Sequence, residues 1–178
     1  MFRSTPTTGA RASAVLAHDT PIGRLVLAAS DRGLTKARFS TGRDTVGTGT
    51  TTPAARTWLD LARAELDAYF AGDLRRFSVP LDLHRVGDPH RRIYDALGDV
   101  GFGQTVTYGA LAARLGLIDD GPRQVGVAMA RNPILIVIPC HRVLGANGSL
   151  TGYAGGLSAK RALLDLESLD HAAQPPLW

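Results

Sequence analysis

The stretch of sequence that decides the fold runs from Thr107 to Val143 and reads TYGALAARLGLIDDGPRQVGVAMARNPILIVIPCHRV. Thr107 is a favourable N-cap residue, and it predicts a short helix over residues 108–115. A second short helix is predicted over 123–131, after a turn that contains Gly and Pro. Two short helices joined by such a turn are typical of a helix-turn-helix.

The same stretch contains the only cysteine of the chain, Cys140, directly after an apolar, strand-like run over residues 134–139. Reactive side chains are often displayed where a strand gives way to a loop. His141 and Arg142 follow Cys140, and such neighbours lower a thiol pKa and increase the thiolate fraction. A thiolate, a base and an orienting acid form a common nucleophilic arrangement, in which Glu167 is the candidate acid. The alternative interpretation of Cys140 is a small buried hydrophobic residue.

Two other cysteine chemistries can be tested against the sequence. A cysteine phosphatase would need an arginine six positions after the nucleophile to hold phosphate, but that position is Ala146. A cysteine hydrolase would need a base remote in sequence and an oxyanion hole. The other histidines are His18, His84, His90 and His171, and none lies in a recognisable catalytic context. A hydrolase remains a rival hypothesis, and it predicts multiple turnover.

Composition and charge narrow the class of protein. The chain has 178 residues and a formal net charge of +4, and residues 121–164 contain basic side chains but no Asp or Glu. Such a stretch suits an anionic partner, although chance in a Gly- and Ala-rich region is the alternative. No apolar run approaches the roughly 20 residues that span a bilayer, and the N-terminus shows no secretory signal. With a single cysteine, which excludes an intrachain disulfide, these features predict a cytoplasmic protein without membrane association.

Strand-like and helical patterns alternate on both sides of the helix-turn-helix. The expected elements are strands over 14–17, 24–29, 34–39 and 77–83, and helices over 53–71, 88–97 and 158–169. Short strands separated by turn signals indicate an antiparallel meander. The predicted fold class is therefore α/β (α+β), with a small N-terminal lobe of antiparallel sheet plus helix. A mostly helical C-terminal lobe carries the helix-turn-helix and the active-site cysteine.

The domain organisation follows from these patterns. We expect an N-terminal α/β lobe over residues 13–84 and a C-terminal domain over 85–170. Residues 1–12 are rich in Thr, Arg and Gly, which predicts a disordered N-terminus. Residues 171–178 are expected to form a tail.

Residues 138–143, which read IPCHRV, resemble the active-site signature of the O6-alkylguanine-DNA alkyltransferases. The flanks resemble the same family: TYG at 107–109 precedes the first short helix, RQVG at 123–126 opens the second, and GYAGGL at 152–157 follows the cysteine. The resemblance is strong over residues 85–169 and looser over the N-terminal lobe. It implies a protein that repairs alkylated DNA.

The resemblance also implies residue roles. Cys140 is the alkyl acceptor, His141 deprotonates it through a water molecule, and Glu167 holds the imidazole in its working tautomer. Tyr108 donates a proton or hydrogen bond to the departing guanine, and Arg123 fills the gap left by a flipped nucleotide. Asn132 ties the helix-turn-helix to the active-site segment. The residues expected on the DNA-binding side are Tyr108, Arg123, Gly126, Ala128, Arg131 and Asn132. The residues expected to shape the substrate pocket are Val143, Tyr153, Ala154, Gly155 and Gly156.

The implied reaction moves an alkyl group from O6 of guanine, and also from O4 of thymine, irreversibly to Cys140. The damaged nucleotide is expected to be flipped out of double-stranded DNA that the protein approaches through the minor groove. We expect a monomer that needs no cofactor, because the thiolate and the leaving group supply all the chemistry. We expect no metal, because the N-terminal lobe lacks cysteine. A rival from another class is a DNA-binding module that recognises alkylated bases without transfer. The turn over 118–122, which reads IDDGP, departs from the family by its length and acidity, which leaves its effect on DNA docking open.

Overall fold

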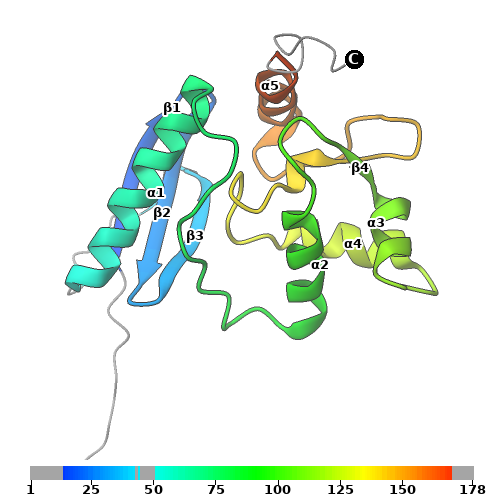
Figure 1. The fold of residues 1–178 in the computed structure, drawn as a ribbon, viewed down its shortest axis with the longest axis horizontal. Coiled ribbons are helices and arrows are strands. Elements are labelled where there is room, and N and C mark those ends of the chain that lie inside the picture. The colour runs from blue at the N-terminus through cyan, green and yellow to red at the C-terminus, as the bar shows by residue number, and fades with distance from the viewer. Residues whose placement is uncertain (1–13, 43, 45–50, 170–178) are drawn as a thin grey trace, which may run out of the picture.

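The computed structural model describes residues 14–42, 44 and 51–169. Three strands form an antiparallel sheet in the order β1-β2-β3, and helix α1 packs along one face of it (Figure 1). These elements are β1 (Ala14–Thr20), β2 (Gly23–Ser30), β3 (Gly33–Phe39) and α1 (Pro53–Ala71). The meander and its covering helix confirm the predicted architecture of the N-terminal lobe. The expected disordered segment 1–12 and the tail 171–178 lie outside the described residues.

Local signals at both ends fix the length of α1. The Thr52 hydroxyl accepts a hydrogen bond from the amide of Ala55 at 3.2 Å, and Pro53 occupies the first turn, where an N–H is not needed. Gly72 ends the helix in the left-handed conformation, with a φ of 85°. The buried side chains of α1 are Ala55, Leu59, Ala62, Glu65, Leu66 and Tyr69.

The C-terminal lobe is mostly helical and carries two short parallel strands. Its elements are α2 (Asp88–Gly98), β4 (Val106–Thr107), α3 (Tyr108–Arg114), α4 (Gly121–Ala130), the 3-10 helix η1 (Cys140–Arg142), β5 (Val143–Leu144) and α5 (Gly156–Leu169). Together with the sheet they confirm the mixed α/β class. None of the helices among the described residues is long and apolar enough to cross a membrane.

The helix-turn-helix is built by α3 and α4, which pack against each other. The Thr107 hydroxyl accepts from the amide of Ala110 at 3.1 Å, so α3 begins at the predicted residue. Helix α4 begins two residues earlier than predicted, because the turn folds back at Asp119 and Asp120, whose φ values are 51° and 58°. The Asp120 carbonyl then accepts the amide of Arg123 at 3.0 Å and closes the first turn.

The predicted strand over 77–83 is wrong. Leu81 forms only an isolated bridge with Leu34 of β3, and the neighbouring Pro80 has no N–H to donate to a ladder. The amides of Ser78 and Val79 instead donate to the carboxylate of Glu65 on α1, at 2.9 and 3.1 Å. The buried Glu65 side chain therefore accepts the backbone hydrogen bonds that the sequence pattern had assigned to a sheet.

The apolar run over 134–139 is buried, but the predicted extended strand is also wrong. Ile134 forms an isolated bridge with Ala37 of β3, and Ile136 adopts a left-handed φ of 73°. The chain folds back at Ile136, so the amide of Ile138 donates to the carbonyl of Ile134 at 3.0 Å. Cys140 consequently lies at the start of η1, after a compact turn rather than at the end of a strand.

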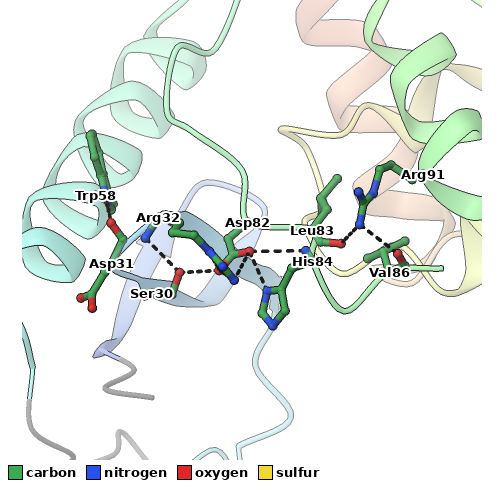
Figure 2. A network of polar contacts seen from close by, with 9 residues as sticks. All are labelled: Ser30, Asp31, Arg32, Trp58, Asp82, Leu83, His84, Val86 and Arg91. Carbon is green, nitrogen blue, oxygen red and sulfur yellow. Dashed lines mark hydrogen bonds and ion pairs between the residues drawn. The ribbon is translucent and has the colours of Figure 1, made fainter. Parts of the chain in front are cut away.

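A polar network ties the segment between the lobes to the tip of the β2–β3 turn (Figure 2). The Asp82 carboxylate accepts from the Ser30 hydroxyl at 2.5 Å and from the Arg32 guanidinium at 3.2 Å. It also lies 2.6 Å from the Nδ1 atom of His84. Burial raises the pKa of Asp82, but the hydrogen bonds from Ser30 and His84 outweigh it and hold that pKa well below its usual range. This anion therefore holds the chain at Asp82 and His84 against the β2–β3 turn.

Candidate active site

A cavity of about 550 Å³ opens between α3, α4 and the loop before α5. Its lining residues are Tyr108, Pro122, Gly126, Met129, Ala130, Cys140, Thr151, Gly152, Tyr153 and Ala154. The volume falls in the range of small-molecule pockets. Cys140 lines this cavity although only 4 % of the residue is exposed. The thiol is therefore shielded from bulk water but reachable from the pocket.

Asn132 holds Cys140 in place from the end of α4. Its Nδ2 atom donates to Cys140 Sγ at 3.1 Å and to the carbonyl of Ile138 at 2.9 Å. Its Oδ1 atom accepts from the amide of Ile134 at 3.0 Å. All three contacts are buried, so one side chain joins the helix-turn-helix, the compact turn and the thiol.

Burial raises the pKa of Cys140 to about 11, although the Asn132 hydrogen bond and the charge of Lys160 act in the opposite direction. The sequence suggested a lowered thiol pKa from the adjacent His141 and Arg142, and this is wrong in the structure. Both neighbours are bonded to Glu167, and removal of the thiol from water dominates its pKa. Cys140 is therefore a protonated thiol at neutral pH, and a base has to remove its proton.

His141 is fully buried and is paired with Glu167, its Nε2 atom lying 2.9 Å from Oε1. Burial lowers the pKa of His141 below its ordinary value, so the ring is neutral at pH 7. A carboxylate can only accept, which places the proton on Nε2 and leaves a lone pair on Nδ1. Nδ1 has no hydrogen-bond partner among the described residues. The ring thus has the protonation state that a base requires.

The carboxylate of Glu167 is held from several directions. Arg142 donates through Nε to Oε2 at 2.9 Å and through Nη2 to Oε1 at 2.8 Å. The hydroxyl of Tyr69 donates to Oε1 at 2.8 Å, and the amide of Gly103 donates to Oε2 at 3.2 Å. Burial raises the pKa of Glu167, but the bonds from His141 and Arg142 bring it down to about 2. Glu167 is accordingly an anion at every pH near neutrality.

The wall of the cavity is fixed by Lys160, which is fully buried on α5. Its Nζ atom donates to the carbonyls of Val143 and Thr151, at 2.6 and 3.2 Å. The Thr151 hydroxyl in turn donates to the Tyr108 hydroxyl oxygen at 2.9 Å. In this arrangement the proton of Tyr108 remains free to point elsewhere.

The DNA-binding residues expected from the sequence separate into two groups. Arg123 projects from the start of α4 with its side chain 80 % exposed, 3.6 Å from the Asp120 carboxylate, and Arg131 is exposed at the end of the helix. Gly126 lines the cavity. Ala128 is different because it is fully buried, with its carbonyl accepting from the Tyr94 hydroxyl at 2.8 Å. The expectation that Ala128 faces DNA is therefore wrong, since this side of α4 packs onto α2.

The expected pocket residues separate in the same way. Tyr153 and Ala154 line the cavity, whereas Val143, Gly155 and Gly156 do not. Val143 is fully buried, and its carbonyl is bound by Lys160. A Cβ atom on Gly155 would lie 2.1 Å from the ring of Phe39, so this glycine permits the close approach of the N-terminal lobe. Gly156 begins α5 with a φ of 84°.

The sequence assigned no site role to Tyr69, Thr151 and Lys160, and it indicated Arg142 only as a neighbour of the thiol and not as a partner of Glu167. Arg142 lies in the IPCHRV motif, so its position was a usable signal. Tyr69 carried none, because it is separated from Glu167 by 98 positions. Among the described residues, no group of three or more His, Cys, Asp or Glu side chains could hold a metal ion.

Fold and site define a class of protein: an α/β chain in which a helix-turn-helix borders a cavity lined by a buried cysteine that precedes a histidine–glutamate pair. Two family models match the chain. The model for 6-O-methylguanine DNA methyltransferase, ribonuclease-like domain, matches residues 16–83. The model for the DNA binding domain of 6-O-methylguanine DNA methyltransferase matches residues 88–169. The chain belongs to the 6-O-methylguanine DNA methyltransferase family.

Individual relatives agree with this assignment. The chain is 43 % identical over 155 residues to the methylated-DNA–protein-cysteine methyltransferase of Mycolicibacterium paratuberculosis, which covers 84 % of this chain and 88 % of the relative. The crystal structure of Mycobacterium tuberculosis O6-methylguanine methyltransferase superposes with a TM-score of 0.73 at 39 % identity, covering 93 % and 96 % of the two chains. The structure of Mycobacterium tuberculosis OGT in complex with DNA gives a TM-score of 0.74 at 41 % identity, covering 88 % and 92 %.

Proposed function

We propose that the protein repairs DNA by moving an alkyl group from O6 of guanine, and also from O4 of thymine, onto Cys140. The observation that carries the proposal is the thiol itself, which lines a cavity beside the helix-turn-helix and is followed by a neutral, carboxylate-bound imidazole. A base inside a duplex is out of reach of a buried thiol, so the damaged nucleotide has to leave the stack and enter the cavity.

The chemistry balances with the groups at the site. His141 Nδ1 takes the proton of Cys140 through a water molecule, while Glu167 stabilises the imidazolium that forms. Sγ attacks the alkyl carbon, the bond from that carbon to O6 breaks, and its electron pair passes into the purine. Tyr108 supplies a proton or hydrogen bond to the departing guanine, which the donation from Thr151 to its oxygen leaves it free to do. The product is a thioether, which is a poor leaving group, so each molecule acts once.

Docking on DNA follows from the exposed face of α4. Gly126 lies on the cavity side of the helix and has no side chain to obstruct a groove about 6 Å wide. Arg123 and Arg131 flank it as exposed cations suited to phosphates and to the gap in the stack. We propose that α4 enters the minor groove of alkylated duplex DNA. The protein is proposed to act as a monomer in the cytoplasm, where a reducing environment keeps Cys140 a thiol.

Arg123→Ala should slow repair of duplex DNA far more than reaction with the free base O6-benzylguanine. Unstacking and unpairing a base costs a few kcal/mol. A residue that offsets part of this cost should contribute roughly 1–3 kcal/mol, or about 5- to 150-fold in rate. Single-turnover rates at saturating duplex and with the free base measure the difference.

Tyr108→Phe is the matched control for Arg123→Ala, because its proposed contact is to the purine and both substrates should slow. The exposed ion pair of Arg123 with Asp120 contributes little to stability, so folding should not confuse the comparison. Equal slowing of duplex and free base by Arg123→Ala, or no slowing of either, would show that this side chain does not assist flipping.

A further inference from the structure

Tyr69 is a buried tyrosine that connects the two lobes at the active site. It belongs to α1, which packs on the sheet, and it is fully buried. Its hydroxyl donates to Glu167 Oε1 at 2.8 Å, the same oxygen that accepts from His141. Every cavity-lining residue comes from positions 108–154, so α1 contributes nothing to the pocket directly. Its link to the chemistry is this single hydrogen bond.

We propose that Tyr69 is a positioning residue for alkyl transfer, through which the N-terminal lobe holds Glu167 against His141 and keeps Glu167 from accepting the proton that His141 takes up. The inference rests on the proposed role of His141 as the base. It adds that the base works only while α1 is docked on the C-terminal lobe.

The donors around Glu167 support this role. Oε1 accepts from Tyr69, His141 and Arg142, and Oε2 accepts from Arg142 and the amide of Gly103. A carboxylate has about four lone-pair sites, so these donors occupy its accepting capacity fully. An oxygen that is already shared among three donors is a weak base. The proton that reaches His141 therefore stays on the ring, and Glu167 remains an anion that stabilises the imidazolium.

Tyr69 is also suited to this task by its surroundings. Burial and the charge of Glu167 raise its pKa, so the hydroxyl keeps its proton and always acts as a donor. The rings of Phe70, Phe77 and Phe102 surround it, with centroids 5.3, 5.4 and 6.0 Å away. Packing against Phe70 and Phe77 of the N-terminal lobe and Phe102 of the C-terminal lobe therefore restricts the ring and sets the position of the hydroxyl.

The test compares Tyr69→Phe with Tyr94→Phe in the full chain. Tyr94 is the matched control, because its buried hydroxyl also donates at 2.8 Å but to a backbone carbonyl, that of Ala128. Both variants lose one buried hydrogen bond, so they should lower the melting temperature to a similar degree. With O6-benzylguanine, Tyr69→Phe should react about tenfold more slowly, the order expected for a hydrogen bond to a charged group. Tyr94→Phe should react at the wild-type rate.

Two further measurements separate positioning from a packing defect. Removing a donor makes Glu167 more basic, so the acid limb of the rate profile should move to higher pH in Tyr69→Phe and stay in place in Tyr94→Phe. Added to His141→Ala, Tyr69→Phe should cause no further slowing, because it acts through that ring. The role of Tyr69 alone is overturned if Tyr69→Phe reacts at the wild-type rate while His141→Ala is slow. It is also overturned if Tyr69→Phe slows the wild-type protein and the His141→Ala variant by the same factor. A wild-type rate for His141→Ala overturns the proposed base and the role of Tyr69 with it.

Discussion

Cys140→Ser should reduce alkyl transfer by more than about 10⁴-fold, the order seen when a catalytic nucleophile is lost. A hydroxyl is far less ionised than a thiol in the same buried position, and its oxygen is a weaker nucleophile toward a saturated carbon. The substitution is nearly isosteric, and the serine Oγ can still accept the bond from Asn132 that Sγ now accepts at 3.1 Å. Single-turnover assays with methylated duplex and with O6-benzylguanine measure the loss.

The control for Cys140→Ser is binding of the same duplex, measured by fluorescence anisotropy. Arg123, Gly126 and Arg131 are unchanged in this variant, so affinity for DNA should remain near the wild-type value. If Cys140→Ser transfers the alkyl group within about tenfold of the wild-type rate and carries it on another residue, Cys140 is not the acceptor.

His141→Ala should slow transfer at pH 7 by about 10²–10⁴-fold, the range for loss of a general base. Burial raises the pKa of Cys140 to about 11, so only about one thiol in 10⁴ would be ionised at that pH without help. The neutral ring of His141, whose pKa burial lowers, is the group that we propose removes the proton. His141→Gln, which fills more of the same space, should show the same loss and so exclude a packing defect.

The pH dependence of His141→Ala provides a second readout. Below the pKa of Cys140, the thiolate fraction rises about tenfold for each unit of pH. The variant should therefore recover rate steeply between about pH 7 and pH 10, whereas wild type should depend on pH less. Reaction rates of both proteins with O6-benzylguanine, measured between about pH 7 and pH 10, test this difference in pH dependence. A variant that matches wild type at neutral pH, or that follows the same pH profile at a constant offset, would contradict a role for His141 in proton removal.

The elements that the sequence predicted correctly are those whose signals are local. Thr107 caps α3, Pro53 and Gly72 bound α1, and the turns between short strands predict the meander. The errors occur where distant groups replace the expected partners. The backbone at Ser78 is satisfied by Glu65, which removes a predicted strand, and Ile136 adopts a left-handed turn that no apolar pattern reveals.

At the site, too, the sequence predicted the features that depend on neighbouring residues and missed those that depend on residues far apart in the chain. The motif around Cys140 predicted which residues meet beside the cavity, because Cys140, His141 and Arg142 are continuous in sequence. The direction of the Cys140 pKa was predicted wrongly, since burial depends on the whole fold and outweighs the adjacent charges. The family resemblance assigned Ala128 to DNA binding and Gly155 to the pocket, yet each serves close packing within the protein. Tyr69 could not be predicted at all, because only folding brings α1 to Glu167.

The most direct test of alkyl transfer to Cys140 is the intact mass of the wild-type protein after incubation with excess duplex containing O6-methylguanine. We expect the gain of one methyl group per molecule, with peptide mapping placing it on Cys140 and an equal amount of guanine restored in the DNA. The reaction should then stop, even when damaged duplex remains. An unmodified protein that repairs many duplexes, as a hydrolase would, or a methyl group mapped to any other residue, would show that Cys140 is not the alkyl acceptor.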